Sequence, residues 1–216
     1  MKLLREYIRS LLTEAAMGTK DLEAIDGAMI TITDWGSSAN VQYYDASETS
    51  GYNDGRLSSK EVRWPPSGRV AIGEIIDPEM WNHGPCDGAW QVQEANADHG
   101  WGPLLYDVAI EFATMRANGL VPDRREVSFD ARNVWKYYLS NRSDVKSHQL
   151  DNLKNKLTKT EKDNCNQEEA EYKYGEEEYM TSKAKWWKSP LSKRYTKTPT
   201  VINRLRKLGR IEIEKV

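Results

Sequence analysis

The chain has 216 residues, of which 38% are hydrophobic and 30% are charged, and its formal net charge is −2 at pH 7. This length suits one well-cored domain with appendages or two small domains, and the high charged fraction indicates that part of the chain is solvated extension. Balanced charge argues against nucleic acid or an anionic membrane as the partner, and no apolar run is long enough to span a bilayer. The eight Trp and eleven Tyr, against two Phe, predict a core of large rings whose polar groups need partners.

The first predicted element is an amphipathic helix over residues 1–12, in which charges interrupt every apolar segment, so it is not a secretory signal peptide. The arm 1–14 resembles the delivery peptides of internal virion proteins of large tailed phages. The prohead protease of such phages cuts after a glutamate that has Leu or Ile two residues earlier, as in Leu12-Thr13-Glu14. The resemblance implies a cut after Glu14, phage head proteins and this protease as partners, and a place in the host cytoplasm or the virion interior. An ordinary N-terminal helix packed on the domain is the alternative.

A run of alternating and β-branched segments then predicts a sheet that begins with a hairpin. Antiparallel strands followed by one strand–loop–helix unit are typical of an α+β fold. Strands are expected at residues 28–33, 40–44, 61–64, 69–76 and 88–94, and loops at 34–39, 46–61 and 77–87.

The last of these strands leads into Ala97-Asp98-His99-Gly100-Trp101-Gly102, a loop with two glycines that opens a predicted amphipathic helix reaching about Met115. Pro103 suits the first turn of that helix, where an N–H group would have no intrahelical partner. Free amides and the positive end of the helix dipole suit a phosphate or pyrophosphate. On spacing alone, glycines that only permit close packing on a strand are the commoner explanation.

The strand, the glycine loop and the helix together resemble the core of the GNAT acetyltransferase superfamily, over about residues 28–140. In that family a splayed strand pairs with the pantetheine arm of acetyl-CoA, and the amides of a Gln/Arg-x-x-Gly-x-Gly/Ala loop hold its pyrophosphate. Gly100 and Gly102 stand on the two small positions, while Ala97 replaces Gln or Arg. The resemblance implies a mixed, mainly antiparallel sheet flanked by helices, with acetyl-CoA as the cofactor. Its contacts would come from Val92, Glu94, Asn96, His99, Gly100, Trp101, Gly102, Pro103 and Leu104.

Two side chains are candidates for catalysis of acetyl transfer to an amine. Glu74, on the strand 69–76, is the candidate general base, and an exposed edge carboxylate is the alternative. Beyond a weak strand region at 119–124, Ser128 is the expected N-cap of a helix over 129–139. Many family members carry on this helix a Tyr that protonates the CoA thiolate; here Trp135 takes that position. Tyr137 or Tyr138 would substitute if the helix is rotated or shifted, and Tyr138 is the candidate acid. Core packing of Trp135 and Tyr138 is the alternative, which leaves open a catalytically silent binding protein.

The remaining residues, 141–216, form a polar extension of the expected core 22–140. A short helix and loops are expected after residue 142, and the basic segment 183–194 contains Trp186 and Trp187. These rings either stack on nucleic acid or, as we favour, pin the segment to the domain. A helix over 198–208 and a closing strand over 210–214 complete the chain.

The two cysteines, Cys86 and Cys165, stand alone in the sequence, and no metal-ligand spacing includes them. No disulfide is predicted, and a reducing intracellular setting is the expectation.

Overall fold

The computed structural model describes residues 22, 24, 28–44, 68–75, 83–97, 100–125, 127–152, 156–167 and 183–216, without the side chains of residues 129, 130 and 183–185. The expected N-terminal helix with its cut after Glu14, the strand over 61–64 and His99 all lie outside these residues. Within them, no helix is long and apolar enough to cross a membrane.

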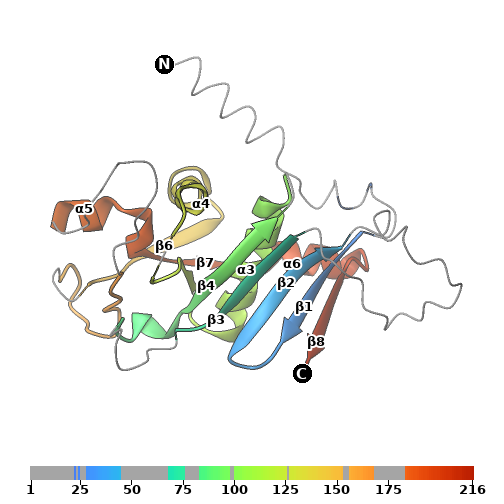
Figure 1. Ribbon diagram of the computed structural model, residues 1–216, viewed down its shortest axis with the longest axis horizontal. Helices are drawn as coiled ribbons and strands as arrows, with labels where there is room; N and C mark the ends of the chain where they lie inside the picture. Colours follow the sequence, from blue (N-terminus) through green and yellow to red (C-terminus); the bar gives the residue numbers. More distant parts are fainter. Residues whose placement is uncertain are drawn as a thin grey trace, which may run out of the picture. The chain divides into compact units, whose positions relative to one another are not determined.

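One mixed, mostly antiparallel sheet of eight strands and four helices make up the described fold (Figure 1), so the α+β prediction is confirmed. The strand order is β6-β7-β5-β4-β3-β2-β1-β8. The strands are β1 (Met29–Asp34), β2 (Ser38–Tyr44), β3 (Gly68–Glu74), β4 (Trp90–Ala97), β5 (Leu120–Val121), β6 (Val145–Gln149), β7 (Lys193–Lys197) and β8 (Ile211–Lys215). The helices are α3 (Gly102–Arg116), α4 (Phe129–Asn141), α5 (Lys183–Lys188) and α6 (Thr200–Lys207), with 3-10 turns η2 (Cys86–Gly88) and η3 (Pro190–Ser192).

The contacts within the chain divide it into two compact units. Unit 1 contains the described residues of Met1–Ala71, Glu94–Val108 and Thr200–Val216, and unit 2 contains those of Ile72–Gln93 and Ala109–Pro199. The elements β3, β4 and α3 each begin in one unit and end in the other.

In unit 1 the predicted hairpin is confirmed, because β1 and β2 pair antiparallel from Met29↔Tyr44 to Asp34↔Ala39. Alternate residues of both strands are buried, as the period of two requires. The turn between the strands uses Gly36 at φ +86°, whose N–H donates to Asp34 Oδ1 at 2.9 Å. The closing strand is also confirmed: β8 pairs parallel with β1 at the end of the sheet (Figure 1).

Helix α3 is buried on nearly all sides, so the prediction that it is amphipathic is wrong. From Leu104 to Ala113, every residue except Asp107 is buried. A helix that is apolar all round belongs inside a domain rather than on its surface. Even Glu111 has no exposed surface. Its carboxylate pairs with Lys197 Nζ at 2.5 Å, and this pairing compensates the loss of hydration.

In unit 2, β5 consists of two residues and pairs parallel with β4 through Trp90↔Leu120 and Gln91↔Val121. Pro122 cannot donate a ladder hydrogen bond, which explains why the strand ends there. The polar region after residue 142 contains the strand β6, and β7 lies between β5 and β6, antiparallel to both. The described residues of this region, 142–152 and 156–167, form no helix, and the rest of the range in which a short helix is expected lies outside the described residues. Neither β6 nor β7 was predicted.

Helix α4 begins as expected, since Ser128 Oγ accepts from the Ala131 N–H at 3.2 Å. Core packing of its rings is confirmed as well. Trp135 is 1% exposed and stacks on Tyr195 with 4.9 Å between ring centroids, and Tyr138 is 2% exposed. Of the tryptophan pair, Trp186 is buried and donates from Nε1 to Leu150 O at 2.8 Å, whereas Trp187 is 58% exposed.

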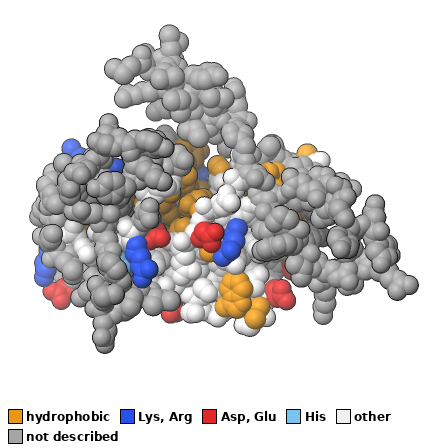
Figure 2. Space-filling view, viewed as in Figure 1, with side chains coloured by type: hydrophobic (Ala, Val, Ile, Leu, Met, Phe, Trp, Pro, Cys, Tyr) orange, Lys and Arg blue, Asp and Glu red, His pale blue; other side chains and the backbone are white. Residues whose placement is uncertain are grey.

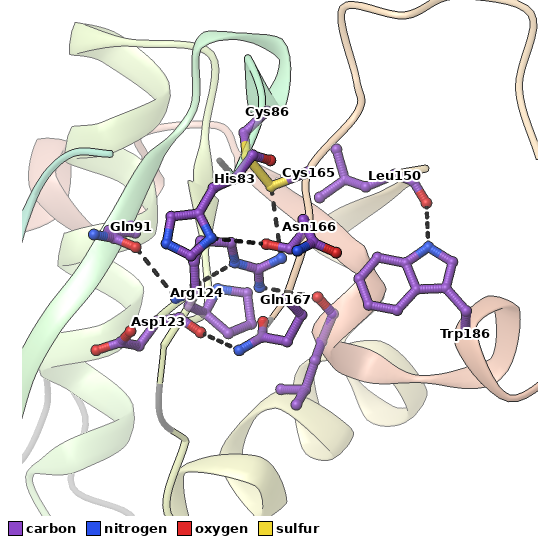
Figure 3. Close-up of a disulfide and its surroundings, with 12 residues drawn as sticks. His83, Cys86, Gln91, Asp123, Arg124, Leu150, Cys165, Asn166, Gln167 and Trp186 are labelled. Atoms are coloured by element: carbon purple, nitrogen blue, oxygen red, sulfur yellow. Dashed lines mark hydrogen bonds between the residues drawn. A yellow bond between two sulfur atoms is a disulfide. The ribbon is translucent and has the colours of Figure 1, made fainter. Parts of the chain in front are cut away.

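The expectation of two isolated cysteines is wrong, because Cys86 and Cys165 form a disulfide in unit 2 (Figure 3). Their separation of 79 residues carries no spacing signal. Backbone pairing brings the two segments together: Cys86 N–H donates to Asn164 O at 2.9 Å, and Asn166 N–H donates to His83 O at 2.7 Å.

Candidate ligand site at the start of helix α3

The end of β4 and the start of α3 are packed closely against the beginning of β3 in unit 1. A Cβ atom added to Gly68 would lie 2.8 Å from Leu105 Cδ1 and 3.3 Å from Ala97 Cα. Both contacts are tighter than ordinary van der Waals packing, so only glycine fits at residue 68 without a shift of its neighbours. This close approach fixes where the strand ends and where the helix begins.

Of the glycine loop between them, Gly100 and Trp101 are described. Gly100 has φ +91°, which favours glycine because a Cβ atom is strained there. Trp101 is 6% exposed and stacks on Tyr43 of β2, with 4.0 Å between ring centroids. The Leu105 N–H donates to Trp101 O at 3.1 Å and closes the first helical turn. Trp101 is thus held by Tyr43 of the hairpin and by Leu105 of the helix.

The amides that precede this first turn form the candidate anion site. Among the described residues, no group accepts a hydrogen bond from the N–H of Gly102 or of Leu104, and Pro103 has no N–H. Apart from its chain neighbours and the backbone of its own helix, no described atom lies within 4 Å of the position that a Gly102 Cβ would take. The first turn of α3 contains no acidic residue. An open space in front of unpaired helical amides is suited to an anion such as a phosphate.

The other residues proposed for the cofactor differ in exposure. Along one face of β4, Val92 is buried, whereas Glu94 and Asn96 are exposed. The Glu94 carboxylate forms an ion pair with Arg69 at 3.4 Å. Pro103 is half-buried and Leu104 is 3% exposed, so at Leu104 only the backbone is available to a ligand.

The two candidate catalytic side chains belong to unit 2, whereas Gly100 and Gly102 belong to unit 1. Glu74 is the last residue of β3 and its side chain is exposed. This agrees with the alternative to a general base, which is an exposed carboxylate. Tyr138 lies in the core, beneath the Arg142 guanidinium at 5.2 Å from its ring centroid, and edge-on to Tyr137. A role in proton transfer to a ligand would require this ring to be uncovered.

Comparisons of the chain with protein-family models, with curated proteins and with solved structures find no match. On the face drawn in Figure 2, acidic and basic side chains occur beside one another, in keeping with the small net charge. Recognition of an anion at α3 would accordingly depend on local amides rather than on a general field.

Unit 2 contains a second unusual group of residues, centred on the disulfide, that sequence reasoning missed (Figure 3). Arg124 has no exposed surface, and its guanidinium donates to Pro122 O at 3.0 Å, Leu191 O at 2.9 Å and Cys165 Sγ at 3.6 Å. Among the described residues, no carboxylate forms an ion pair with it. In the sequence Arg124 is the first of two adjacent arginines that follow Pro122 and Asp123. Such a polar segment is typical of an exposed turn, so the sequence does not indicate that Arg124 is buried.

Burial has a clear effect on this arginine. Loss of hydration lowers the pKa of Arg124 from 12.5 to about 9, while the charge of Asp123 and the nearby Tyr195 oppose the shift. The side chain therefore remains a cation at neutral pH. A buried cation whose contacts are two carbonyls and a sulfur is the strongest electrostatic feature of this group.

Proposed function

We propose that this chain is a GNAT-like protein that binds acetyl-CoA, with the pyrophosphate on the backbone amides of residues 100–104. Two observations carry the proposal: no described group accepts a hydrogen bond from the Gly102 or Leu104 N–H, and the space beside the Gly102 Cα is open, at the end of a strand and the start of a buried helix. The order strand, glycine loop, long helix is the part of the family that binds the cofactor. The positive φ of Gly100 explains why the first small position is glycine here.

The end of β4 offers a strand edge along which the pantetheine arm of acetyl-CoA could bind. Only Trp90 and Gln91 pair with β5, and β4 continues from Val92 to Ala97 beyond the last pair. Residues 93–96 are exposed, so both faces of this strand end are open. An extended arm can add to such a strand through main-chain hydrogen bonds. Val92, Glu94 and Asn96 would offer their backbone groups to it.

Acetyl transfer to an amine is the activity that follows if the cofactor reacts, with Glu74 as general base and Tyr138 as acid. A specific observation favours the alternative of a catalytically silent binding protein. Tyr138 is 2% exposed, and Trp135, at the family's acid position, is 1% exposed and has no acidic proton to donate. Appearance of free CoA with amine acceptors separates the two candidates.

Changing the charge in front of the helix tests the cofactor proposal. Because Gly102 has space for a side chain, Gly102→Glu and Gly102→Gln should both fold, and Glu near a helix N-terminus should add about 0.3–1 kcal/mol of stability. Acetyl-CoA at about 100 times its dissociation constant should stabilise the unsubstituted chain by roughly 2.7 kcal/mol in a thermal-shift assay. We expect this gain to be smaller in Gly102→Glu than in its neutral, equally large control Gly102→Gln. Equal gains in all three proteins would contradict the proposal.

We further propose that the protein is associated with the virion interior, with phage head proteins and the prohead protease as partners, before or after a stay in the host cytoplasm. The support is the segment Leu12-Thr13-Glu14 in the arm. Peptide mass mapping of mature particles should find a new N-terminus at Ala15. An intact Met1 terminus in those particles would contradict it.

A further inference from the structure

We propose that Cys86 and Cys165 are a reversible thiol–disulfide couple, and that the reduced state is a Cys86 thiol beside a Cys165 thiolate paired with Arg124. The proposal concerns unit 2 alone and does not depend on acetyl-CoA binding. Figure 3 shows the four residues on which it rests, His83, Cys86, Arg124 and Cys165, gathered around the sulfur–sulfur bond.

The contact of Arg124 with Cys165 determines which sulfur carries the charge. The guanidinium has no exposed surface, and its NH1 lies 3.6 Å from Cys165 Sγ. Its other acceptors, Pro122 O and Leu191 O, are neutral. A buried cation without a counter-ion is costly, and a disulfide sulfur is only a weak acceptor. A thiolate at Cys165 would supply the missing negative charge, as cations do at reactive cysteines in general.

The other sulfur has a partner suited to a neutral thiol. Cys86 Sγ lies 3.8 Å from His83 O. In the disulfide this sulfur carries no hydrogen, so nothing is donated across that distance. After reduction the Cys86 S–H could donate to the carbonyl. The oxidised structure therefore already contains a donor facing Cys165 and an acceptor facing Cys86, which is the asymmetry that a thiolate–thiol pair requires.

The buried guanidinium also affects how readily the disulfide is reduced. Its acceptors in the oxidised state, two carbonyls and a disulfide sulfur, are all neutral, and reduction places a negative charge within its reach. We therefore expect this disulfide to be easier to reduce than an ordinary structural one.

The reaction partner is a small thiol such as glutathione. Two thiols each give one electron and become a disulfide, while the Cys86–Cys165 bond breaks. Of their two protons, one goes to Cys86 and one is released to water, because Cys165 remains a thiolate. Both sulfurs are fully buried, so exchange has to follow a local opening, and the couple is best measured at equilibrium.

The released proton provides the test. The full chain is equilibrated in glutathione buffers between about pH 6 and pH 8, below the range where free thiols titrate, and the reduced fraction is measured by alkylation and mass spectrometry. We expect the equilibrium constant for reduction to rise tenfold per pH unit, which corresponds to about 30 mV for two electrons. A constant that does not change with pH would overturn the proposal, and this measurement needs no variant.

Variants separate Arg124 from other charges nearby. The titratable and charged groups that surround the couple are His83, Asp87, Asp123, Asp151, Lys162, Asp163, Arg194 and Tyr195. Histidine is the only side-chain type in this set that ordinarily changes charge near neutral pH. Since Arg124→Met keeps His83, a pH dependence that persists in this variant would overturn the role of Arg124.

We expect the tenfold slope to vanish in Arg124→Met, to remain in the neighbouring exposed control Arg125→Met, and to return in part in Arg124→Lys, which restores a cation. Loss of the slope in Arg125→Met as well would contradict the assignment, because it would show that any change of charge in this turn has the same effect.

Discussion

Three charged side chains of β7 are buried, and each has a different set of partners. Lys193 Nζ donates to Gln149 Oε1 and to Trp187 O, Arg194 pairs with Asp87 at 2.8 Å, and Lys197 pairs with Glu111. These contacts compensate the loss of hydration that burial imposes on a cation. In the sequence Lys193 and Arg194 end the basic segment 183–194, and charged residues at 193, 194 and 197 leave no apolar alternation, which explains why β7 was not predicted.

Asp144 should make stability depend on pH in the acid range. Its pKa is lowered from 3.8 to about 2, first by the hydrogen bond from Arg142 and then by the charges of Arg142 and Lys197, with burial acting in the opposite direction. A depressed pKa adds stability above pH 4 that is lost as the pH falls towards 2. Because the carboxylate is 49% exposed, screening limits this contribution to about 1 kcal/mol or less.

Urea unfolding of Asp144→Asn and of the unsubstituted chain measures this contribution. We expect the variant to be less stable at pH 6 and the two proteins to converge near pH 2. A difference that persists undiminished at pH 2 would show that the carboxylate acts through its shape or packing rather than through its charge.

At the scale of elements, the sequence predicted correctly those helices and strands whose formation depends on residues close together in the chain. The alternation of β1 and β2, the Ser128 cap of α4 and the C-terminal helix and strand all follow from short-range patterns and are present. Helix α3 was placed correctly but its character was not, because a buried carboxylate such as Glu111 appears in a sequence as a polar face. The strand β5 falls within the weak strand region expected at 119–124, whereas β6 has a single apolar residue, Val145, and could not be recognised before its neighbours are known.

The segment α5 offers a matched pair of rings with opposite environments. Trp186→Phe removes a buried Nε1–H donor from Leu150 O and leaves a space, so we expect a loss of about 1–3 kcal/mol. Trp187→Phe changes a ring that is 58% exposed and should stay within about 0.5 kcal/mol. Urea unfolding curves of both variants measure the difference. Similar losses of stability in the two variants would show that the Trp187 ring is packed in the folded protein, in contradiction to its exposure in the structure.

At the scale of the whole molecule, the contacts that sequence reasoning missed are long-range. The disulfide joins residues 79 apart in the sequence, and β7 enters the sheet between strands that precede it by more than 40 residues. Nothing in the spacing of Cys86, Arg124 and Cys165 indicates that they meet. The glycine loop is different, because its candidate ligand groups are backbone amides within five residues, 100–104, and a motif of a few residues is sufficient to suggest them.

The most direct test of the proposed cofactor site observes these amides themselves. In protein labelled with 15N-glycine, addition of acetyl-CoA should shift the amide signals of Gly100 and Gly102, with Gly102→Ala used to assign the latter. Gly36 and Gly209, at turns elsewhere in unit 1, should not move. If acetyl-CoA leaves the signals of Gly100 and Gly102 unchanged, the start of α3 does not bind the cofactor.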